Sequence, residues 1–200
     1  MKTLIFATNN TNKVIEIRSL LDETFAIISL SEAGIHVDIP EPFNTLEENA
    51  IEKSEFIYKL KGVSCFAEDT GLEVDALDGE PGVKSARYAG EERSFEKNID
   101  KLLETMIHIP EKERMAAFRC VLVYLAYPDD PAPLICQGTW QGVILTAPRG
   151  ENGFGYDPIF FDREKNCSAA QLPIAIKNQI SHRGKALRLL LENLAEKLQG

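Results

Sequence analysis

Two adjacent carboxylates, Glu68 and Asp69, are the residues whose types and spacing first suggest chemistry in this chain. The apolar residues 65–67 before them predict the end of a buried strand, and residues 70–71 predict a turn. Residues 72–76 then alternate between apolar and acidic, which predicts a half-buried strand. A carboxylate pair at a strand end, beside a turn that lets a ligand approach, suits a hard cation such as Mg²⁺. The alternative is two solvated acids in a loop.

The start of the chain predicts an anion site. Residues 3–7 predict a buried strand, residues 8–13 form a polar loop that ends in Lys13, and a helical pattern begins at Val14. Free backbone N–H groups and the dipole of a helix N-terminus attract phosphate. The pattern G-x-x-x-x-G-K-[ST] is absent, so a P-loop is excluded. Alternatively, the Asn and Thr residues of the loop only cap the helix.

Another carboxylate and another amine lie on a helix that we expect to begin after Thr45. Thr45 and Glu48 have the spacing of a capping box, which explains Glu48 without any chemistry. Lys53 follows Glu48 by five residues, which is a rotation of roughly 140° around a helix. The two side chains are therefore expected on different faces, and Lys53 is expected to be solvated.

Two later segments predict contacts with a ligand. Glycines surround Phe154 in the stretch 149–161, so its ring can lie flat against a nucleobase; the alternative is a hydrophobic plug. His182, Arg183 and Lys185 crowd the first turn of the last predicted helix, and Lys177 lies just before it. Cations at a helix N-terminus oppose the helix dipole, which indicates a nearby acceptor or anion.

The remaining elements predict a scaffold. Ser94 is expected to cap a helix, and the longest apolar run, residues 115–127, predicts a central strand. Its expected antiparallel partner is the segment 134–145, joined to it by a six-residue loop.

Composition limits the possible classes of protein. The chain has 200 residues, of which 44% are hydrophobic and 26% charged, with a formal net charge of −9. This charge disfavours nucleic-acid binding, and a polyphosphate would need a metal ion and well-placed Lys and Arg side chains. The four cysteines do not show the C-x-x-C spacing that is typical of zinc sites. No apolar run reaches the length of a signal peptide or a membrane span, so we expect a cytoplasmic protein without membrane partners.

Five motifs together resemble one family. They are ATNNTNK, TLEENA, FAEDTGLEVDALDGEPGVKSARYAG, GFGYDPIF and KNQISHRGKAL, in the order expected of the inosine triphosphate pyrophosphatase family. The resemblance extends from Thr3 to about Leu191. It implies an α/β fold with a long mixed central sheet flanked by helices, forming one two-lobed domain over residues 1–200. An active-site cleft would lie between the lobes, and the protein would be a homodimer.

The resemblance also implies an activity. Members of this family hydrolyse non-canonical purine nucleoside triphosphates (dITP, ITP, XTP) to the monophosphate and pyrophosphate with Mg²⁺. Asp69 would act as the general base, and Glu48 and Asp69 would bind the metal ion. Glu68 stands where many members have Asp, so it would be a further metal ligand or an acid behind the ligands.

Substrate-binding residues follow from the same resemblance. Phosphate ligands would be Thr8, Asn9, Asn10, Thr11, Asn12, Lys13 and Lys53, with Thr70 as a further substrate contact. The base pocket would consist of Phe154, Gly155, Tyr156, Asp157, Lys177, His182 and Arg183. Donors from His182 or Arg183 would pair with the 6-oxo group of hypoxanthine or xanthine. Two alternatives stay open: a Maf-like nucleotide pyrophosphatase with other substrates, and a nucleotide-binding protein without turnover.

Overall fold

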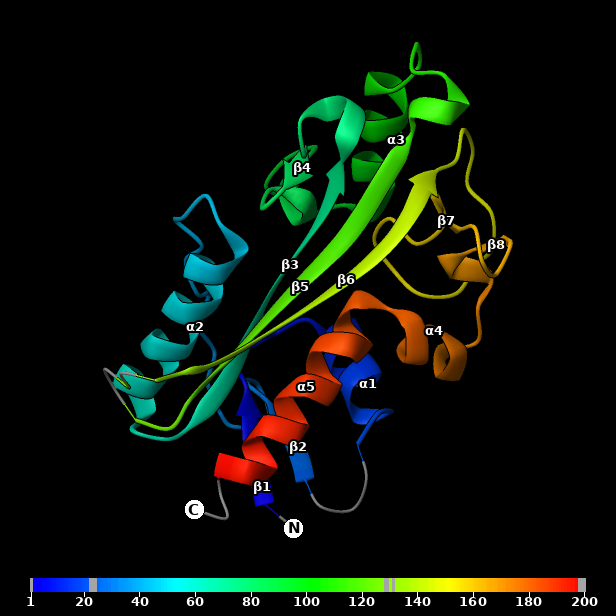
Figure 1. Ribbon diagram of the computed structural model, residues 1–200. Coiled ribbons are helices and arrows are strands. Elements are labelled where there is room, and N and C mark those ends of the chain that lie inside the picture. The colour runs from blue at the N-terminus through cyan, green and yellow to red at the C-terminus, as the bar shows by residue number, and fades with distance from the viewer. Residues whose placement is uncertain (1, 22–24, 128–129, 131, 198–200) are drawn as a thin grey trace. The chain divides into compact units, whose positions relative to one another are not determined.

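The structure is a computed structural model that describes residues 2–21, 25–127, 130 and 132–197. Its strands are β1 (Lys2–Phe6), β2 (Phe25–Ser29), β3 (Cys65–Val74), β4 (Pro81–Gly82), β5 (Met115–Leu125), β6 (Leu134–Ile144), β7 (Phe160–Asp162) and β8 (Cys167–Ser168). Its α-helices are α1 (Thr11–Arg18), α2 (Leu46–Lys61), α3 (Phe95–Thr105), α4 (Ile174–Ile180) and α5 (His182–Lys197) (Figure 1).

The described strands form one eight-stranded mixed sheet in the order β2-β1-β3-β5-β6-β7-β8, with β4 paired to β3. Strand β1 runs parallel to β2 and β3, whereas β7 runs antiparallel to β6 and β8. The predicted α/β class with a long mixed sheet is confirmed, and β5 and β6 are neighbours as expected. Residues 128, 129 and 131 of their predicted connection lie outside the described residues.

The chain divides into two compact units. The first consists of residues 1–69, 120–138 and 182–200, and the second of residues 70–119 and 139–181. The chain passes from one unit to the other within β3 and β5 and at Gly138 of β6. The active-site cleft that the resemblance implies stays a prediction.

In the first unit, the sheet has helices on both faces. Leu4, Phe6 and Phe66 belong to a core cluster that also contains residues of α1 and α5. Cys65 and Ala67 belong to a second cluster that contains Ile57 of α2. Figure 1 shows α2 on one side of β1 and β3, and α1 and α5 on the other. Because successive side chains of a strand point to opposite faces, the even positions among residues 65–69 of β3 face α1 and α5, and the odd positions face α2.

Side-chain caps open helices α1 and α2 of the first unit. The Oδ1 atom of Asn10 accepts hydrogen bonds from the backbone N–H groups of Asn12 (3.0 Å) and Lys13 (3.2 Å). The hydroxyl oxygen of Thr45 accepts one from the backbone N–H of Glu48 (3.2 Å). These bonds satisfy donors that a helix N-terminus otherwise leaves free. The predicted cap at Thr45 is therefore confirmed, and Asn10 supplies the cap that the alternative interpretation of the polar loop offered.

Helix α5 starts in close contact with β6. A Cβ atom at Gly138 would lie 2.0 Å from the backbone carbonyl oxygen of His182, so a glycine is needed at this point of β6. The close approach fixes the position of the first turn of α5, which carries His182 and Arg183.

The prediction that the first strand of the central motif ends at Glu68 is wrong. Strand β3 is continuous from Cys65 to Val74, so Glu68 and Asp69 lie within a strand, and Thr70 and Gly71 do not form a turn. A Cβ atom at Gly71 would lie 2.6 Å from the carbonyl oxygen of Gly82 in β4. The glycine is explained by this close approach between two strands and not by a turn.

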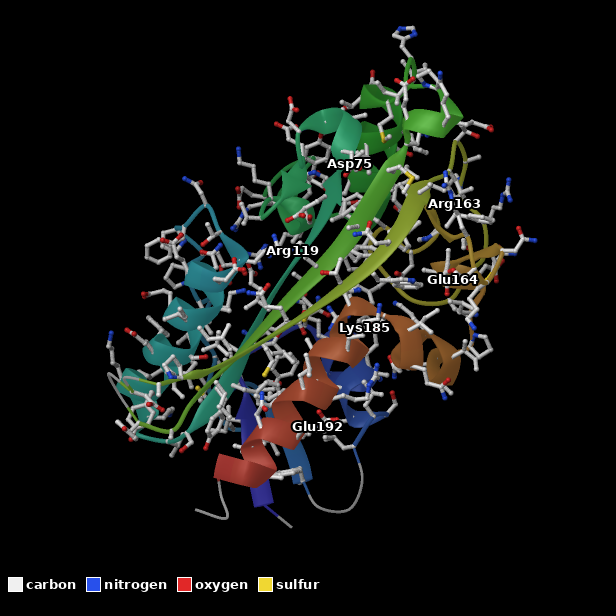
Figure 2. The ribbon with its side chains drawn as sticks, in the orientation of Figure 1. Asp75, Arg119, Arg163, Glu164, Lys185 and Glu192 are labelled. Carbon is white, nitrogen blue, oxygen red and sulfur yellow. The ribbon has the colours of Figure 1, made fainter. Side chains whose placement is uncertain are left out.

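The second unit has its own core. The rings of Phe118, Trp140 and Phe160 pack together, and the Trp140 indole N–H donates to an oxygen of Asp162 (2.7 Å). Helix α3 begins after Ser94, which caps it as predicted. Arg119 of β5, labelled in Figure 2, is half-buried and pairs with Glu73 of β3 at 3.1 Å.

Among the helices that the structure describes, none has both the length and the apolar character needed to cross a membrane.

Candidate active site

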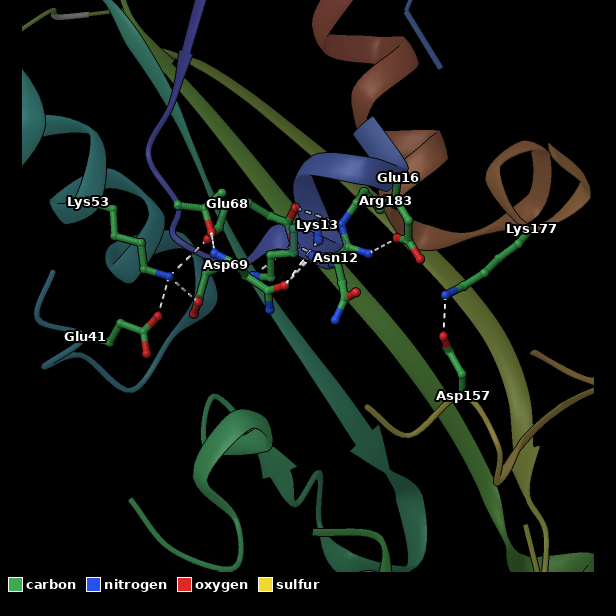
Figure 3. A network of polar contacts seen from close by, with 12 residues as sticks. Asn12, Lys13, Glu16, Glu41, Lys53, Glu68, Asp69, Asp157, Lys177 and Arg183 are labelled. Atoms are coloured by element: carbon green, nitrogen blue, oxygen red, sulfur yellow. Dashed lines mark hydrogen bonds and ion pairs between the residues drawn. The ribbon is translucent and has the colours of Figure 1, made fainter. Parts of the chain in front are cut away.

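Asp69 and Lys53 form a buried ion pair in the first unit. The Lys53 Nζ donates to Asp69 Oδ1 at 2.7 Å and to the backbone carbonyl of Glu68 at 3.0 Å (Figure 3). The Asn49 side-chain amide lies 3.4 Å from Asp69 Oδ2. Lys53 is only 5% exposed, so the expectation of a solvated lysine is wrong. Asp69 occupies an odd position of β3 and therefore faces α2, which supplies both partners.

Glu41 completes this cluster, and no sequence pattern indicated it. Its Oε1 lies 2.5 Å from the Lys53 Nζ. Glu41 lies between Pro40 and Pro42 in a loop without regular secondary structure. No helical or strand periodicity connects such a residue with α2, so only the tertiary structure brings the two together.

The charges of the cluster shift its pKa values in defined directions. Burial raises the pKa of Asp69 above the ordinary carboxyl range, and the positive charges of Lys53 and Lys13 oppose this shift in part. Burial disfavours the Lys53 cation, but Asp69 and Glu41 outweigh it and raise the pKa of Lys53. Lys53 is therefore a cation at neutral pH. A carboxylate with a raised pKa is better matched to accepting a proton near neutrality.

Glu48, the other predicted metal ligand, has different surroundings. It is exposed, and its Oε2 accepts a hydrogen bond from the Thr45 hydroxyl at 2.6 Å. The expectation that Glu48 and Lys53 lie on different faces of α2 is confirmed, since Lys53 is buried. Within the described residues, no group of three or more His, Cys, Asp or Glu side chains is placed to hold a metal ion. The metal-binding role of Glu48 stays a prediction.

Of the predicted phosphate loop, residues 8–10 precede α1, whereas Thr11, Asn12 and Lys13 form its first turn, so the helix begins three residues before the predicted start at Val14. The backbone N–H of Asn10 donates to the Thr8 hydroxyl (3.1 Å), and the Asn9 side chain donates to the carbonyl of Val37 (2.9 Å). Because Asn10 occupies the N–H groups of residues 12 and 13, the Lys13 ammonium is the clearest remaining group for an anion. Its Nζ lies 3.2 Å from Glu68 Oε1. The phosphate-binding role of Thr8–Lys13 stays a prediction.

Glu68 faces the opposite side of β3 from Asp69. The Arg183 Nε donates to Glu68 Oε2 at 2.9 Å, and Nη2 donates to Oε1 at 2.7 Å. Arg183 also donates from Nη1 to Glu16 of α1 (Figure 3). All three side chains are buried. The predicted role of Arg183 in the base pocket is untested, and these bonds join it to carboxylates near Lys13.

In the second unit, Asp157 organises the glycine-rich loop. Its Oδ2 accepts from the Phe154 backbone N–H (2.8 Å) and from the Lys177 Nζ (2.5 Å). A Cβ at Gly153, whose φ is +74°, would lie 2.0 Å from this oxygen. The Lys177 Nζ also lies 5.3 Å from the centroid of the Phe154 ring. The structure thus brings together Phe154, Asp157 and Lys177, and their role in a base pocket stays a prediction.

The other predicted base-pocket and substrate residues have varied surroundings. Tyr156 is buried, its hydroxyl donates to the Ser85 carbonyl (2.9 Å), and burial raises its pKa, so it supports the loop from the core. Gly155 adopts a φ of +62°. His182 is buried as the first residue of α5 in the first unit, and Thr70 is half-buried in the part of β3 that belongs to the second. Their contacts with substrate stay predictions.

Three residues in these networks were missed from the sequence. Glu41 had no signal, as described above. Glu16 follows Lys13 by three residues on α1, so the i,i+3 spacing together with the buried neighbour Ile17 could have indicated it. Asn49 follows Glu48 directly. It was missed because this part of α2 was interpreted only as a capping box.

Fold and site together define an α/β protein with a buried carboxylate–lysine cluster beside a strand–loop–helix segment. The chain belongs to the Ham1 family, whose sequence model matches residues 4–193. It is 48% identical over 197 residues to the dITP/XTP pyrophosphatase of Vibrio vulnificus (strain YJ016), covering 98% of each chain. It is 47% identical over 195 residues to the dITP/XTP pyrophosphatase of Escherichia coli (strain K12), covering 97% of this chain and 98% of that one.

Solved structures of related proteins are similar to this chain over nearly its whole length. A HAM1 protein from Coxiella burnetii superposes with a TM-score of 0.89 at 42% identity, over 98% of this chain and 100% of that one. The nucleoside-triphosphatase / dITP/XTP pyrophosphatase from Mycobacterium abscessus superposes with a TM-score of 0.75 at 36% identity, over 94% and 98%. The predicted family resemblance is confirmed.

Proposed function

We propose that this protein hydrolyses non-canonical purine nucleoside triphosphates (dITP, ITP, XTP and dXTP) to the monophosphate and pyrophosphate, which removes them from the nucleotide pool. The observation that carries the proposal is the buried cluster of Asp69, Lys53 and Glu41. Nearly full-length relatives named dITP/XTP pyrophosphatase support the choice of substrate.

Asp69 is the proposed general base. Its carboxylate would accept a proton from the water that attacks the α-phosphorus, and pyrophosphate would leave. Lys53 and Asn49 hold the carboxylate in one orientation, since each donates to a different oxygen. Enzymes that cleave phosphoanhydrides depend mainly on alignment and charge stabilisation, so a fixed base in a water-poor site suits this reaction.

The donor chemistry of the cluster fits magnesium. Mg²⁺ prefers oxygen ligands and commonly takes one or two protein carboxylates, with the remaining positions filled by substrate phosphates and water. We propose that Asp69 and Glu41 supply these carboxylates, with Glu48 as the alternative from the sequence. When bound, magnesium would neutralise phosphate charge and stabilise the departing pyrophosphate.

Positive side chains of the first unit would hold the phosphates. Lys13 keeps part of its side chain exposed, and Lys53 carries its charge next to Asp69. The proposed phosphate ligands are therefore Lys13 and Lys53, together with the polar residues of the loop that starts at Thr8.

Base recognition is proposed for Phe154, Asp157 and Lys177, with His182 and Arg183. The ring of Phe154 offers a stacking face, and Lys177 offers a donor beside it. Hypoxanthine and xanthine present a 6-oxo acceptor, whereas adenine presents a 6-amino donor. A buried donor left without an acceptor can disfavour adenine by about 10⁴-fold.

The deciding experiment is a substrate panel. Purified protein with Mg²⁺ is incubated with dITP, XTP, dATP or dGTP, and the released product is identified as pyrophosphate or phosphate. We expect pyrophosphate, with much faster turnover of dITP and XTP. Release of orthophosphate, or equal rates on all four nucleotides, contradicts the proposal, and binding without turnover indicates a nucleotide-binding protein.

Homodimer formation and a cytoplasmic location belong to the same proposal. The family resemblance supports the dimer. Size-exclusion chromatography with light scattering measures the first, and cell fractionation with an antibody against the protein measures the second.

A further inference from the structure

Glu68 lies next to the proposed catalytic base in sequence but serves a different set of partners. The alternation of side chains along β3 directs Asp69 toward α2 and Glu68 toward α1 and α5. Each partner agrees with this direction, since Lys53 comes from α2 and Arg183 from α5. The two adjacent acids are therefore not a carboxylate pair with a common ligand.

Both oxygens of Glu68 are already engaged by cations. Arg183 binds them as a fork, through Nε to Oε2 and through Nη2 to Oε1, and Lys13 lies 3.2 Å from Oε1. Two parallel bonds from a guanidinium fix a carboxylate in angle as well as in distance. Glu16 takes a further N–H group of Arg183. The four side chains form a chain of alternating charge, Glu16–Arg183–Glu68–Lys13, with a formal sum of zero.

Only one end of this chain is open to solvent. The side chains of Glu68, Arg183 and Glu16 are 0%, 2% and 5% exposed, whereas that of Lys13 is 17% exposed. A buried charge needs a counter-charge, so the three inner members hold one another in place. An anion that arrives at the loop before α1 would meet Lys13, whose direction is set by the Glu68 carboxylate.

We propose that Glu68 is a positioning residue: clamped by Arg183 and Glu16, it aims the Lys13 ammonium at the phosphates of the substrate and is not a metal ligand. The inference rests on the proposed function for the identity of the substrate. It assigns to Arg183 a role in phosphate alignment through Glu68. It also explains why a second acid precedes Asp69 without belonging to the same cluster.

The test measures binding of inorganic tripolyphosphate by calorimetry in the presence of EDTA, so that no metal ion takes part. Glu68→Gln keeps the shape of the side chain and removes the charge that holds Lys13. We expect the affinity to fall about tenfold, the scale of one lost charge-assisted contact. Simple electrostatics predicts the opposite, because one negative charge fewer near an anion site raises affinity. An unchanged or higher affinity therefore overturns the proposal.

A double-variant comparison separates positioning from general structural damage. If Glu68 acts through Lys13, Glu68→Gln should weaken tripolyphosphate binding no further in a Lys13→Met background. Additive losses contradict the proposal. Glu68→Asp keeps the charge and should recover most of the affinity. The matched control is Glu73→Gln, which removes an arginine partner from the same strand in the second unit and should leave binding unchanged.

A second variant and a comparison of binding with turnover complete the test. If Glu68→Gln does not fold, Arg183→Lys tests the same point, because it keeps the charge but loses the fork and should still weaken binding. A wild-type protein that does not bind tripolyphosphate overturns the positioning role. If wild-type protein binds tripolyphosphate with the expected variant pattern but releases no pyrophosphate from dITP, the positioning role stands and the proposed function fails.

Discussion

At the scale of single residues, the candidate site depends on which carboxylate faces which cation. Asp69 lies between Lys53 and Asn49, and Glu41 lies on the other side of Lys53. Two carboxylates thus face the Lys53 ammonium group, and their charges allow the lysine to stay buried in its ionised form. This arrangement leads to two predictions about single side chains.

The first prediction concerns the proposed base. Asp69→Asn keeps the size of the side chain but cannot accept a proton, so we expect kcat for dITP to fall by about 10²- to 10⁴-fold. The fold should persist because Glu41 still balances Lys53, and circular dichroism checks this. Asp75→Asn, at an exposed aspartate just after the same strand, is the control. Wild-type turnover in Asp69→Asn would show that another group is the base.

The second prediction separates Glu41 from Glu48. Glu41 contacts the Lys53–Asp69 pair, whereas Glu48 contacts Thr45 at the surface. We expect Glu41→Gln to lower kcat/KM for dITP by about tenfold or more and to raise the Mg²⁺ concentration needed for half-maximal rate. Glu48→Gln is measured in parallel. A larger loss in Glu48→Gln than in Glu41→Gln supports the assignment made from the sequence and rejects the one made from the structure.

At the scale of elements, side chains at their ends hold helices and strands of the first unit together. Arg18 at the end of α1 donates to the carbonyl of Ile27 in β2 and to Glu32. Glu32 also accepts from the backbone N–H and the hydroxyl of Ser29. One carboxylate thus fastens the end of α1 to the end of β2.

The third prediction follows from the pKa of this carboxylate. Its bond with Arg18, followed by those with Ser29, lowers the pKa of Glu32 from 4.5 to about 2. A folded-state pKa below the unfolded value means that the charged form stabilises the fold at neutral pH. This stabilisation is lost as the pH falls from about 4.5 toward 2.

Glu32→Gln should therefore lower the urea midpoint at pH 7, and its difference from wild type should shrink between pH 5 and pH 3. Glu104→Gln, at an exposed glutamate of α3, serves as the control for the loss of one negative charge. A difference between Glu32→Gln and wild type that stays constant with pH contradicts the assigned pKa shift.

At the scale of the whole molecule, an acidic protein is proposed to bind an acidic substrate. The net charge is −9, yet Lys13, Lys53, Lys177 and Arg183 are concentrated in the described charge networks. Each of these cations has a carboxylate partner in the protein, so none of them needs a substrate or a metal ion as its counter-charge. Folding should then not depend on magnesium.

The fourth prediction tests this independence. EDTA should abolish pyrophosphate release from dITP, and added Mg²⁺ should restore it, because the reaction needs the phosphate charge to be neutralised. The thermal midpoint measured without nucleotide should change little, since the ion pairs replace the metal in balancing charge. A large fall of the midpoint in EDTA would instead indicate a structural metal.

The sequence by itself determined most of the helices and long strands, and it singled out many of the polar residues that the networks contain. The caps at Thr45 and Ser94 and the pairing of β5 with β6 followed from residue types and local periodicity. The α/β class with a long mixed sheet followed from the family resemblance. The motifs also predicted the family, and they put Asp69 forward as the base.

Only the tertiary structure decided which charges meet. Gly71 suggested a turn, but it lies within the continuous strand β3, where its lack of a Cβ allows the close approach to Gly82. A continuous strand directs the Glu68 and Asp69 side chains to opposite faces. Lys53 read as a solvated lysine because its partners, Glu41 and Asp69, lie 12 and 16 residues away. The packing of the sheet against its helices creates these contacts between distant segments. They therefore produce no periodic pattern in the sequence from which they could be predicted.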